Sequence, residues 1–321
     1  MILSDKDDQM NEFSLIETYF KSPAIAYQDV IIGIGDDAAC VKVPQDYELV
    51  ISTDTLVADV HFLSNWDPYA IAYKAVMVNI SDIAAMAATP RWASLALTIP
   101  HLQQHWLDRF SLGLHTALNQ YNIALIGGDT THGPLTITLT MHGLVPDGQH
   151  ITRNGARNSD IILVSGELGA AAMAVMLPQN NNIELLNKLQ RPVPRTDLIL
   201  ILREYATAAI DISDGLSADL KHICQASVVG AHLNSSAIPM HPLIRTLPPK
   251  QALELALTGG DDYELCFTIP ASKMQEFYHC IQNDHLTCYA IGCIESEPGI
   301  RISYPDASKV NYIPKGYDHF K

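Results

Sequence analysis

Short acidic turns, several of them glycine-rich and placed at the ends of apolar strands, recur throughout this chain of 321 residues. The six segments are GDD at 35–37, STDT at 52–55, SD at 81–82, GGD at 127–129, DISDG at 211–215 and GGDD at 259–262. A single aspartate in such a turn usually bonds to its own backbone. Six such segments in one chain, one of them inside an apolar helix, indicate carboxylates placed to hold a cation.

The donor atoms in these segments are carboxylate and hydroxyl oxygens, with no His or Cys between them. Such a set selects a hard cation and favours Mg²⁺ over zinc or iron. Calcium is less expected, because the chain has no twelve-residue EF-hand loop. Mg²⁺ shares its ligands with water and phosphate oxygens, so the pattern implies a bound polyphosphate and phosphoryl transfer. The chain has neither a P-loop nor the motifs of a protein kinase.

The stretch VIIGIGDDAACVKV at 30–43 fits the G-x-G-x-x-G/A pattern of dinucleotide-binding folds, and Asp54 lies about where that pattern wants a ribose-binding acid. In those folds the glycines open a helix whose first amides hold a pyrophosphate. Here the chain continues as a short strand, and two acids occupy the place of the anion. We therefore predict a metal ligand at Asp37 and a turn-shaping or supporting role for Asp36.

Residues 47–62 have strand character, with Val50, Ser52 and Asp54 on one face and Ile51, Thr53 and Thr55 on the other. Residues 67–90 begin with an Asp-Pro helix entry, end at Thr-Pro and are nearly all apolar, so a buried helix is expected.

In that helix Asn79 and Asp82 share one face, and a buried helix has no structural need for Asp82. Residues 121–131 read as a strand that ends in a Gly-Gly turn carrying Asp129, and 133–146 alternate as a half-buried strand should.

The length suits two domains, 1–150 and 151–321, separated by a polar, turn-rich stretch. The net charge of -15 argues against binding of nucleic acid or an anionic membrane. No apolar stretch reaches the roughly 18 to 20 residues of a membrane span, and the N-terminus is acidic, so a cytoplasmic location is expected. The six cysteines are scattered and are expected to be free thiols. His101 and His105 are expected at a helix start, not at a metal.

Seven motifs follow one another along the chain: GIGDDAA, STDTLVADVHF, YKAVMVNISDIAAMAATP, IGGDTTHGPL, DISDGLSADL, GGDDYELCF and KGYDHF. Taken together, they closely resemble those of the thiamine-monophosphate kinase family in order and spacing, from about residue 12 to the end. That family belongs to the aminoimidazole ribonucleotide synthetase superfamily. The resemblance implies an α+β fold of two domains with mixed or antiparallel sheets and helices packed on one side. It also implies a homodimer formed through the N-terminal sheets.

The resemblance implies transfer of phosphate from ATP to thiamine monophosphate, giving thiamine diphosphate, with several Mg²⁺ ions. The N-terminal domain would bind metal and ATP, and the C-terminal domain would complete the active site. The implied metal ligands are Asp37, Ser52, Thr53, Asp54, Asp82, Asp129, Asp211 and Asp214, among which Asp54, Asp82, Asp129 and Asp214 are the catalytic ones. Gly128, Arg153 and Ser213 would contact ATP. His61, Asp261 and Tyr317 would contact thiamine monophosphate.

One departure from the family concerns Asp261, because the family often has Glu at this place and the shorter side chain loses one methylene of reach. Two of the implied residues have simpler interpretations. His61 would be a packed residue beside Phe62, and Arg153 an ordinary surface arginine.

Two other functions stay open. One is a ligase or a selenophosphate-type synthetase of the same superfamily; the latter carries a reactive Cys or selenocysteine near its N-terminus, whereas no Cys precedes Cys40 here. The other is a non-catalytic nucleotide-binding scaffold, which would be expected to have lost several of the acids. This chain keeps them all.

Overall fold

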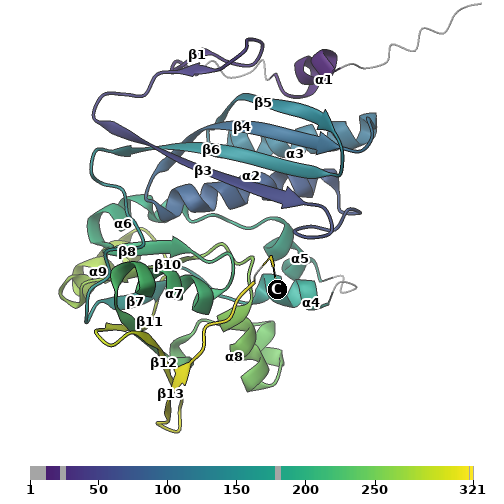
Figure 1. Cartoon of the computed structure of the whole chain (residues 1–321). Helices are drawn as coiled ribbons and strands as arrows, with labels where there is room; N and C mark the ends of the chain where they lie inside the picture. Colours follow the sequence, from purple (N-terminus) through teal and green to yellow (C-terminus); the bar gives the residue numbers. More distant parts are fainter. Residues whose placement is uncertain (1–11, 22–26, 178–181, 318, 321) are drawn as a thin grey trace, which may run out of the picture. The chain divides into compact units, whose positions relative to one another are not determined.

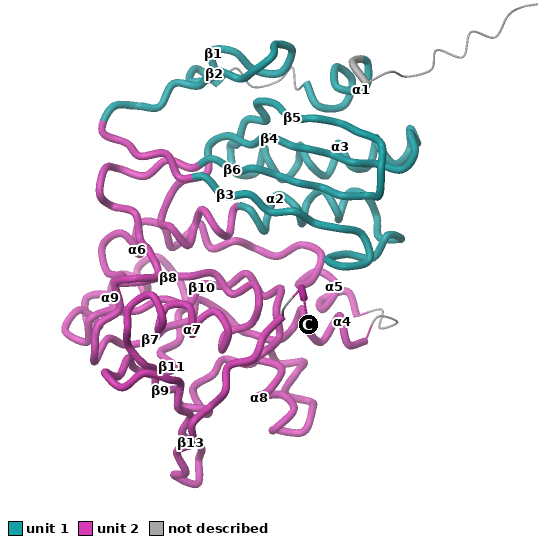
Figure 2. The backbone as a smooth tube through the Cα atoms, in the orientation of Figure 1, with its two compact units in different colours: residues 1–45, 51–79, 91–142 teal, residues 46–50, 80–90, 143–321 magenta. Residues whose placement is uncertain are grey.

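The computed structural model of the chain describes residues 12–21, 27–177, 182–317 and 319–320 (Figure 1). The acidic N-terminal start, on which the predicted location partly rests, lies outside these residues. The chain divides into two compact units (Figure 2): residues 1–45, 51–79 and 91–142 form unit 1, and residues 46–50, 80–90 and 143–321 form unit 2.

The first nine elements run from α1 to β6. They are α1 (Glu12–Tyr19), β1 (Val30–Ile32), β2 (Cys40–Val41), β3 (Tyr47–Val57), α2 (Pro68–Ala85), β4 (Thr89–Ile99), α3 (Gln104–Gln120), β5 (Ala124–His132) and β6 (Thr136–Pro146). Strands β3, β6, β4 and β5 form a four-stranded sheet in that order, with β4 and β5 parallel, while β1 and β2 pair separately.

The four-stranded sheet has helices α2 and α3 on one side only (Figure 1). On β6 the residues Ile137, Leu139 and Met141 are buried, and Thr138 and Thr140 alternate with them. This alternation confirms the half-buried strand predicted here, because side chains of a strand point to opposite faces in turn. The threonine face carries hydrogen bonds between the hydroxyls of Thr53 and Thr140 at 2.9 Å and between those of Thr55 and Thr138 at 2.8 Å.

Helix α2 is the buried apolar helix that the sequence predicts. Its start is fixed by Asp67, whose carboxylate accepts the backbone N–H of Tyr69 at 3.0 Å, and Pro68 occupies the first helical position. The helix ends at Ala85, and Thr89 and Pro90 already belong to β4. Only Asp82 and Met86 interrupt an otherwise buried stretch from Ala75 to Ala88.

The predicted Gly-Gly turn before Asp129 is wrong. Gly127, Gly128 and Asp129 lie within β5, which continues to His132 in parallel register with β4. The register shifts between Ala93 and Ser94 of β4, opposite these glycines. Pairing with β4 therefore keeps the segment extended, where local glycine content alone suggested a turn.

The other elements belong to unit 2. They are β7 (Ile161–Val164), α4 (Ala170–Met176), α5 (Ile183–Gln190), α6 (Ile199–Tyr205), β8 (Ala208–Asp211), α7 (Leu216–Ser227), β9 (Gly230–Asn234), α8 (Pro249–Thr258), β10 (Leu265–Ile269), α9 (Met274–Asn283), β11 (Tyr289–Glu295), β12 (Gly299–Ser303) and β13 (Lys309–Tyr312), with short 3₁₀ turns between some of them. The strands form one mixed sheet in the order β13-β12-β9-β11-β7-β10-β8.

Both faces of this seven-stranded sheet are covered, unlike those of the smaller sheet. Leu265, Phe267 and Ile269 of β10 pack with residues of α6 and α9, among them Tyr205 and Phe277. Helix α7 lies against β8, β9, β10 and β12. Every residue of β10 is consequently buried, Thr268 among them, which explains why the other four residues of the strand are apolar. The whole chain is thus α+β with mixed sheets, as expected.

Among the helices of the described residues, none has the length and apolarity that crossing a bilayer requires. All six cysteines are free; Cys224, Cys266 and Cys288 are buried, whereas Cys40 is exposed. Helix α3 starts at Gln104, so His105 lies in its first turn, as expected.

Candidate active site

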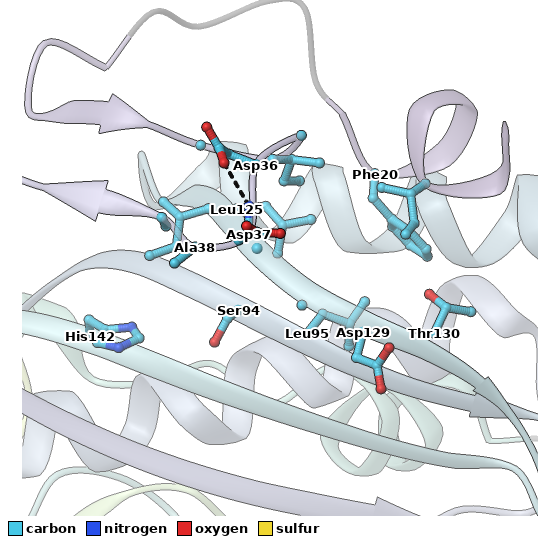
Figure 3. A pocket seen from close by; sticks show the side chains of 18 residues that line it. Phe20, Asp36, Asp37, Ala38, Ser94, Leu95, Leu125, Asp129, Thr130 and His142 are labelled. Atoms are coloured by element: carbon cyan, nitrogen blue, oxygen red, sulfur yellow. Dashed lines mark hydrogen bonds between the residues drawn. The ribbon is translucent and has the colours of Figure 1, made fainter. Parts of the chain in front are cut away.

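A cavity of about 600 Å³ lies in unit 1 between the loop after β1 and the strands β4, β5 and β6 (Figure 3). Asp36 and Asp37 of the loop, Gly128 and Asp129 of β5, and His142 of β6 all line it. Ile16 and Phe20, from α1 and the residue after it, add an apolar wall. Three residues assigned to metal or nucleotide from the sequence, Asp37, Gly128 and Asp129, are thereby brought to one cavity.

The two acids of the GDD segment have different surroundings. The Asp36 carboxylate accepts the backbone N–H of Asp37 at 2.8 Å, which ties it to its own turn (Figure 3). Asp37 is exposed at the cavity, as is Asp129 on the strand opposite. Asp36 is thus tied into the turn, and Asp37 stays the candidate ligand.

Gly128 is required by a close approach of backbone. A Cβ at this position would lie 1.8 Å from the carbonyl oxygen of Leu95 on β4, whereas a Cβ on Gly127 would have no heavy atom within 4 Å. Only glycine fits beside Leu95, so the tight pairing of β4 with β5 sets the position of Asp129.

His142 is a cavity residue that the sequence reasoning did not single out. Burial lowers its pKa, opposed by a hydrogen bond to the backbone of Trp92, so the ring is neutral at physiological pH. Its Nδ1 is buried and has no hydrogen-bond partner among the residues described. The signal was available in the alternation of β6, because His142 continues the face of Thr136, Thr138 and Thr140.

The STDT segment lies on β3, at the edge of the sheet opposite β5. Ser52 and Asp54 share the face of buried Leu56, which turns toward α2, and the Asp54 N–H donates to Asn79 Oδ1 of that helix at 3.3 Å. Thr53 points to the other face, where its hydroxyl bonds to Thr140. The side chains of Ser52 and Thr53 therefore cannot bind one ion, and Thr53 could contribute only its backbone oxygen.

Strands β6 and β4 separate β3 from β5 (Figure 1). At the usual strand spacing, Asp54 and Asp129 are on the order of 14 Å apart. Ligands of one Mg²⁺ lie about 2 Å from the ion, so these two carboxylates of one chain do not share a metal.

His61 follows β3 and has a defined tautomer. Its Nδ1 accepts the backbone N–H of Val57 at 3.0 Å, and a neutral ring therefore carries its proton on Nε2. Phe62, next to it, is buried and 3% exposed, so it fills the packing role and leaves His61 half-buried.

In unit 2 the end of α2 is joined to the end of β8. The Ser81 hydroxyl donates to Asp211 Oδ2 at 2.9 Å, and both residues are buried. Asp82 is adjacent to Ser81 and only half-buried. The bond therefore brings the helix turn that bears Asp82 to the strand end that bears Asp211.

The DISDG turn leads from β8 into α7 and is held by Asp219. The Asp219 carboxylate accepts the backbone N–H groups of Asp214 and Gly215, each at 3.1 Å. Burial raises the pKa of Asp219 to about 7; the Asp214 carboxylate acts in the same direction, and the two backbone bonds and the charge of Arg153 oppose the rise. Arg153 itself is exposed near this turn.

Two further segments are bonded to the DISDG turn. The Asp261 N–H donates to the backbone carbonyl oxygen of Ser213 at 2.9 Å, and the Tyr317 N–H donates to that of Asp214 at 3.1 Å. Unit 2 thus brings together five of the residues predicted from the sequence: Asp211, Ser213, Asp214, Asp261 and Tyr317. Tyr317 is 51% exposed, with its ring against that of His319.

Comparisons with known proteins agree with this arrangement of motifs. Residues 35–145 match the family model described as AIR synthase related protein, N-terminal domain. The thiamine-monophosphate kinase of Escherichia coli (strain K12) is 43% identical over 318 residues, which cover 96% of this chain and 98% of that protein. The chain belongs to the thiamine-monophosphate kinase family.

Solved structures of this family have the same fold. The crystal structure of thiamine-monophosphate kinase from Stenotrophomonas maltophilia K279a aligns with a TM-score of 0.81 and 40% identity, over 85% of this chain and 91% of that one. The structure of AaThiL complexed with AMPPCP and TMP aligns with a TM-score of 0.77 and 32% identity, over 89% of this chain and 92% of that one. As a member of the thiamine-monophosphate kinase family, the chain is an enzyme.

Within the ranges that the structure describes, no three His, Cys, Asp or Glu side chains converge to hold an ion. Mg²⁺ commonly takes one or two carboxylates together with water and phosphate oxygens, unlike zinc. The pair Asp37 and Asp129 on one cavity fits that donor set.

Proposed function

We propose that this member of the family transfers the γ-phosphoryl group of ATP directly to the phosphate of thiamine monophosphate, with Mg²⁺, giving thiamine diphosphate and ADP. The observation that carries the proposal is the match over 89% of the chain to a structure complexed with AMPPCP and TMP. In AMPPCP a methylene replaces the oxygen between the β- and γ-phosphorus atoms of ATP.

The reaction forms a bond between an oxygen of the acceptor phosphate and the γ-phosphorus, and breaks the bond from that phosphorus to the β–γ bridging oxygen. The acceptor oxygen is already ionised, so no strong general base is required. Alignment of the two phosphates and neutralisation of their charge are then the main tasks of the protein. This explains a set of site residues that is rich in Asp and poor in His and Cys.

Several Mg²⁺ ions would be held by the carboxylates and hydroxyls of the predicted ligands, with Thr53 binding through its backbone. The others are Asp37, Ser52, Asp54, Asp82, Asp129, Asp211 and Asp214. When bound, Mg²⁺ neutralises phosphate charge and orients the reacting oxygens. These residues fit the ion because their donors are oxygens and because several of them are at least partly accessible, as Asp37 and Asp129 are.

The contacts to the two substrates are those that the family resemblance implies. Gly128, Arg153 and Ser213 would contact ATP, and the cavity beside Gly128 has the volume of a small-molecule site. His61, Asp261 and Tyr317 would contact thiamine monophosphate. A neutral His61 with its proton on Nε2 offers a hydrogen-bond donor to a phosphate oxygen or an acceptor nitrogen.

Residues 1–150 would bind metal and ATP, and 151–321 would supply the further residues needed for turnover. The enzyme would act in the cytoplasm. The supporting observation is that the six cysteines are free thiols, which a reducing compartment maintains.

We also propose a homodimer formed through the four-stranded sheet. The open face of β3 exposes apolar side chains in alternation: Tyr47 is 43% exposed, Leu49 39% and Ile51 57%. An exposed apolar strip of this kind marks an interaction surface. A two-fold dimer that places β5 of one copy beside β3 of the other would bring Asp129 of one chain to Asp54 of its partner copy, which one chain alone does not do.

The proposed reaction is tested by incubating the protein with ATP, MgCl₂ and thiamine monophosphate and separating the thiamine phosphates by chromatography. Thiamine diphosphate should form in equal amount with ADP. Release of inorganic phosphate without thiamine diphosphate would favour a ligase or an idle hydrolase. Nucleotide binding without any turnover would favour the scaffold.

A further inference from the structure

The segment from Gly259 to Glu264 has no regular secondary structure, and two of its non-glycine residues have left-handed backbones. Asp261 has φ 67° and Tyr263 has φ 51°. Such conformations are unfavourable for residues with a Cβ, most of all for a bulky one, and persist only where the surroundings impose them. They place Asp261, the candidate contact to thiamine monophosphate, in a strained turn.

Backbone bonds hold this turn against the DISDG turn. The Asp261 N–H donates to the backbone carbonyl oxygen of Ser213 at 2.9 Å, and the Tyr263 N–H donates to that of Ile212 at 2.8 Å. Gly260 permits the approach, because a Cβ there would lie 2.4 Å from the Ser213 oxygen. The position of the Asp261 backbone is therefore fixed relative to the residues that follow β8.

The other two acids of the turn are engaged with the segment after β7. Both oxygens of Asp262 accept the Gly169 N–H, at 3.0 and 2.9 Å. Glu264 accepts the Ser165 hydroxyl at 2.6 Å and a guanidinium N–H of Arg195 at 3.0 Å. These contacts anchor the turn from one side.

The side chain of Tyr263 is directed to Asp261 instead. Its hydroxyl donates to Asp261 Oδ1 at 3.0 Å. The bond joins the two residues of the turn that have positive φ. A hydrogen bond between a phenol and a carboxylate fixes the rotation of the short aspartate side chain. With Glu at position 261 the carboxyl group would lie one methylene further from the backbone, and this short bond would need a different geometry.

We propose that Tyr263 is a positioning residue that holds the Asp261 carboxylate in the orientation in which it contacts thiamine monophosphate. The inference deepens the proposed function and rests on it. The tyrosine acts through the aspartate and touches neither the reacting phosphates nor the nucleotide. It therefore governs the affinity for the acceptor substrate and not the rate of phosphoryl transfer.

The test is Tyr263→Phe, which removes only the hydroxyl. The KM for thiamine monophosphate should rise about five- to twentyfold, whereas kcat and the KM for ATP should stay within about twofold. Tyr278→Phe on α9 is the matched control and should change none of these constants. Unchanged affinity in Tyr263→Phe, or parallel losses in kcat, in the KM for ATP and in melting temperature, would overturn the proposal.

A double-mutant cycle with Asp261→Ala separates action through Asp261 from other effects. If Tyr263 acts through the aspartate, Tyr263→Phe should have no further effect in the Asp261→Ala background, where calorimetry measures the Kd of thiamine monophosphate if turnover is slow. Equal effects in both backgrounds would overturn the inference. An unchanged affinity in Asp261→Ala alone would remove the role of Asp261 and the inference with it, while thiamine diphosphate formation by the unaltered enzyme would leave the proposed function intact.

Discussion

The hydroxyl of Ser217 bonds to both backbone polar groups of Lys315, although 97 residues lie between them: it donates to the Lys315 oxygen at 2.7 Å and accepts the Lys315 N–H at 3.1 Å. Ser217 is fully buried at the start of α7. Gly316 follows, where a Cβ would lie 2.6 Å from the Asp214 oxygen. One serine thereby fastens the C-terminal segment that bears Tyr317 beside the DISDG turn.

Ser217→Ala should loosen that segment, because it removes the hydroxyl to which both the N–H and the carbonyl oxygen of Lys315 are bonded. We expect a loss of about 1–3 kcal/mol in the free energy of unfolding. The KM for thiamine monophosphate should rise with it, since Tyr317 loses its anchor. Chemical denaturation and steady-state kinetics measure the two effects. Ser236→Ala, at an exposed serine of the same unit, should be neutral in both, and a neutral Ser217→Ala would contradict the anchoring role.

The adjacent glycines 127 and 128 give a matched pair of variants. Gly128→Ala places a methyl group against the Leu95 carbonyl and should displace β5 from β4, whereas Gly127→Ala meets no atom within 4 Å. We expect Gly128→Ala to destabilise the protein by roughly 2–4 kcal/mol and to weaken ATP binding, because overpacking against backbone has no easy relief. Thermal melts and nucleotide titrations test this. Equal behaviour of the two variants would show that β4 and β5 can separate at little cost.

Ser52 and Thr53 are neighbours on β3 whose side chains point to opposite faces. Ser52→Ala should raise the Mg²⁺ concentration needed for half-maximal activity by about tenfold, because it removes an oxygen from the face of Asp54. Thr53→Val keeps the side-chain shape and should change that concentration less than about threefold, with a stability cost of about 1 kcal/mol from the lost bond to Thr140. A strong magnesium defect in Thr53→Val would show that its hydroxyl turns to the metal side.

Asp262 predicts a specific pH dependence of stability. Burial raises its pKa well above the 3.8 of a free aspartate, and the hydrogen bond from Gly169 opposes that rise. Between pH 3.8 and the raised value the folded protein keeps a proton that the unfolded chain has lost, so stability falls as the pH rises through this window. Asp262→Asn retains an oxygen acceptor for Gly169 and cannot ionise. Its urea midpoint should therefore fall less between pH 5 and pH 8, while the exposed Asp284→Asn should follow the unaltered protein.

The elements could largely be read from the sequence, because apolar periodicity fixes strands and helices. The magnesium site stays a prediction. The alternation of β3 and the apolar run of α2 were predicted correctly. The extended Gly127–Gly128 segment was not, since its conformation comes from pairing with β4. Ser217, Tyr263 and His142 were also missed. Ser217 bonds to Lys315 far along the chain, and Tyr263 meets Asp261 in a turn whose conformation is imposed by contacts with the residues after β8. The alternation of β6 placed His142 on the threonine face, but the cavity beside it is formed by separate segments that no local pattern brings together.

The positions of Asp54 and Asp129 on opposite edge strands allow the proposed dimer to be tested by mixing inactive variants. Asp54→Asn and Asp129→Asn should each lower kcat by several orders of magnitude if both carboxylates hold metal at the reacting phosphates. If each site takes Asp54 from one copy and Asp129 from the other, a mixed dimer has one site with both substitutions and one with neither.

Mixing the two variants in equal amounts, with exchange of subunits, should therefore restore about one quarter of the original sites, because half of the dimers are mixed and half of their sites are intact. As a control for contaminating enzyme, each variant is cross-linked separately before the two are mixed. Subunits then cannot exchange, and the mixture should stay inactive. If both carboxylates of a site came from one chain, every site in the mixture would carry one substitution and activity would not return. Sedimentation of the mixture shows whether dimers are present, so that a missing recovery with intact dimers would count against sharing of the site between copies.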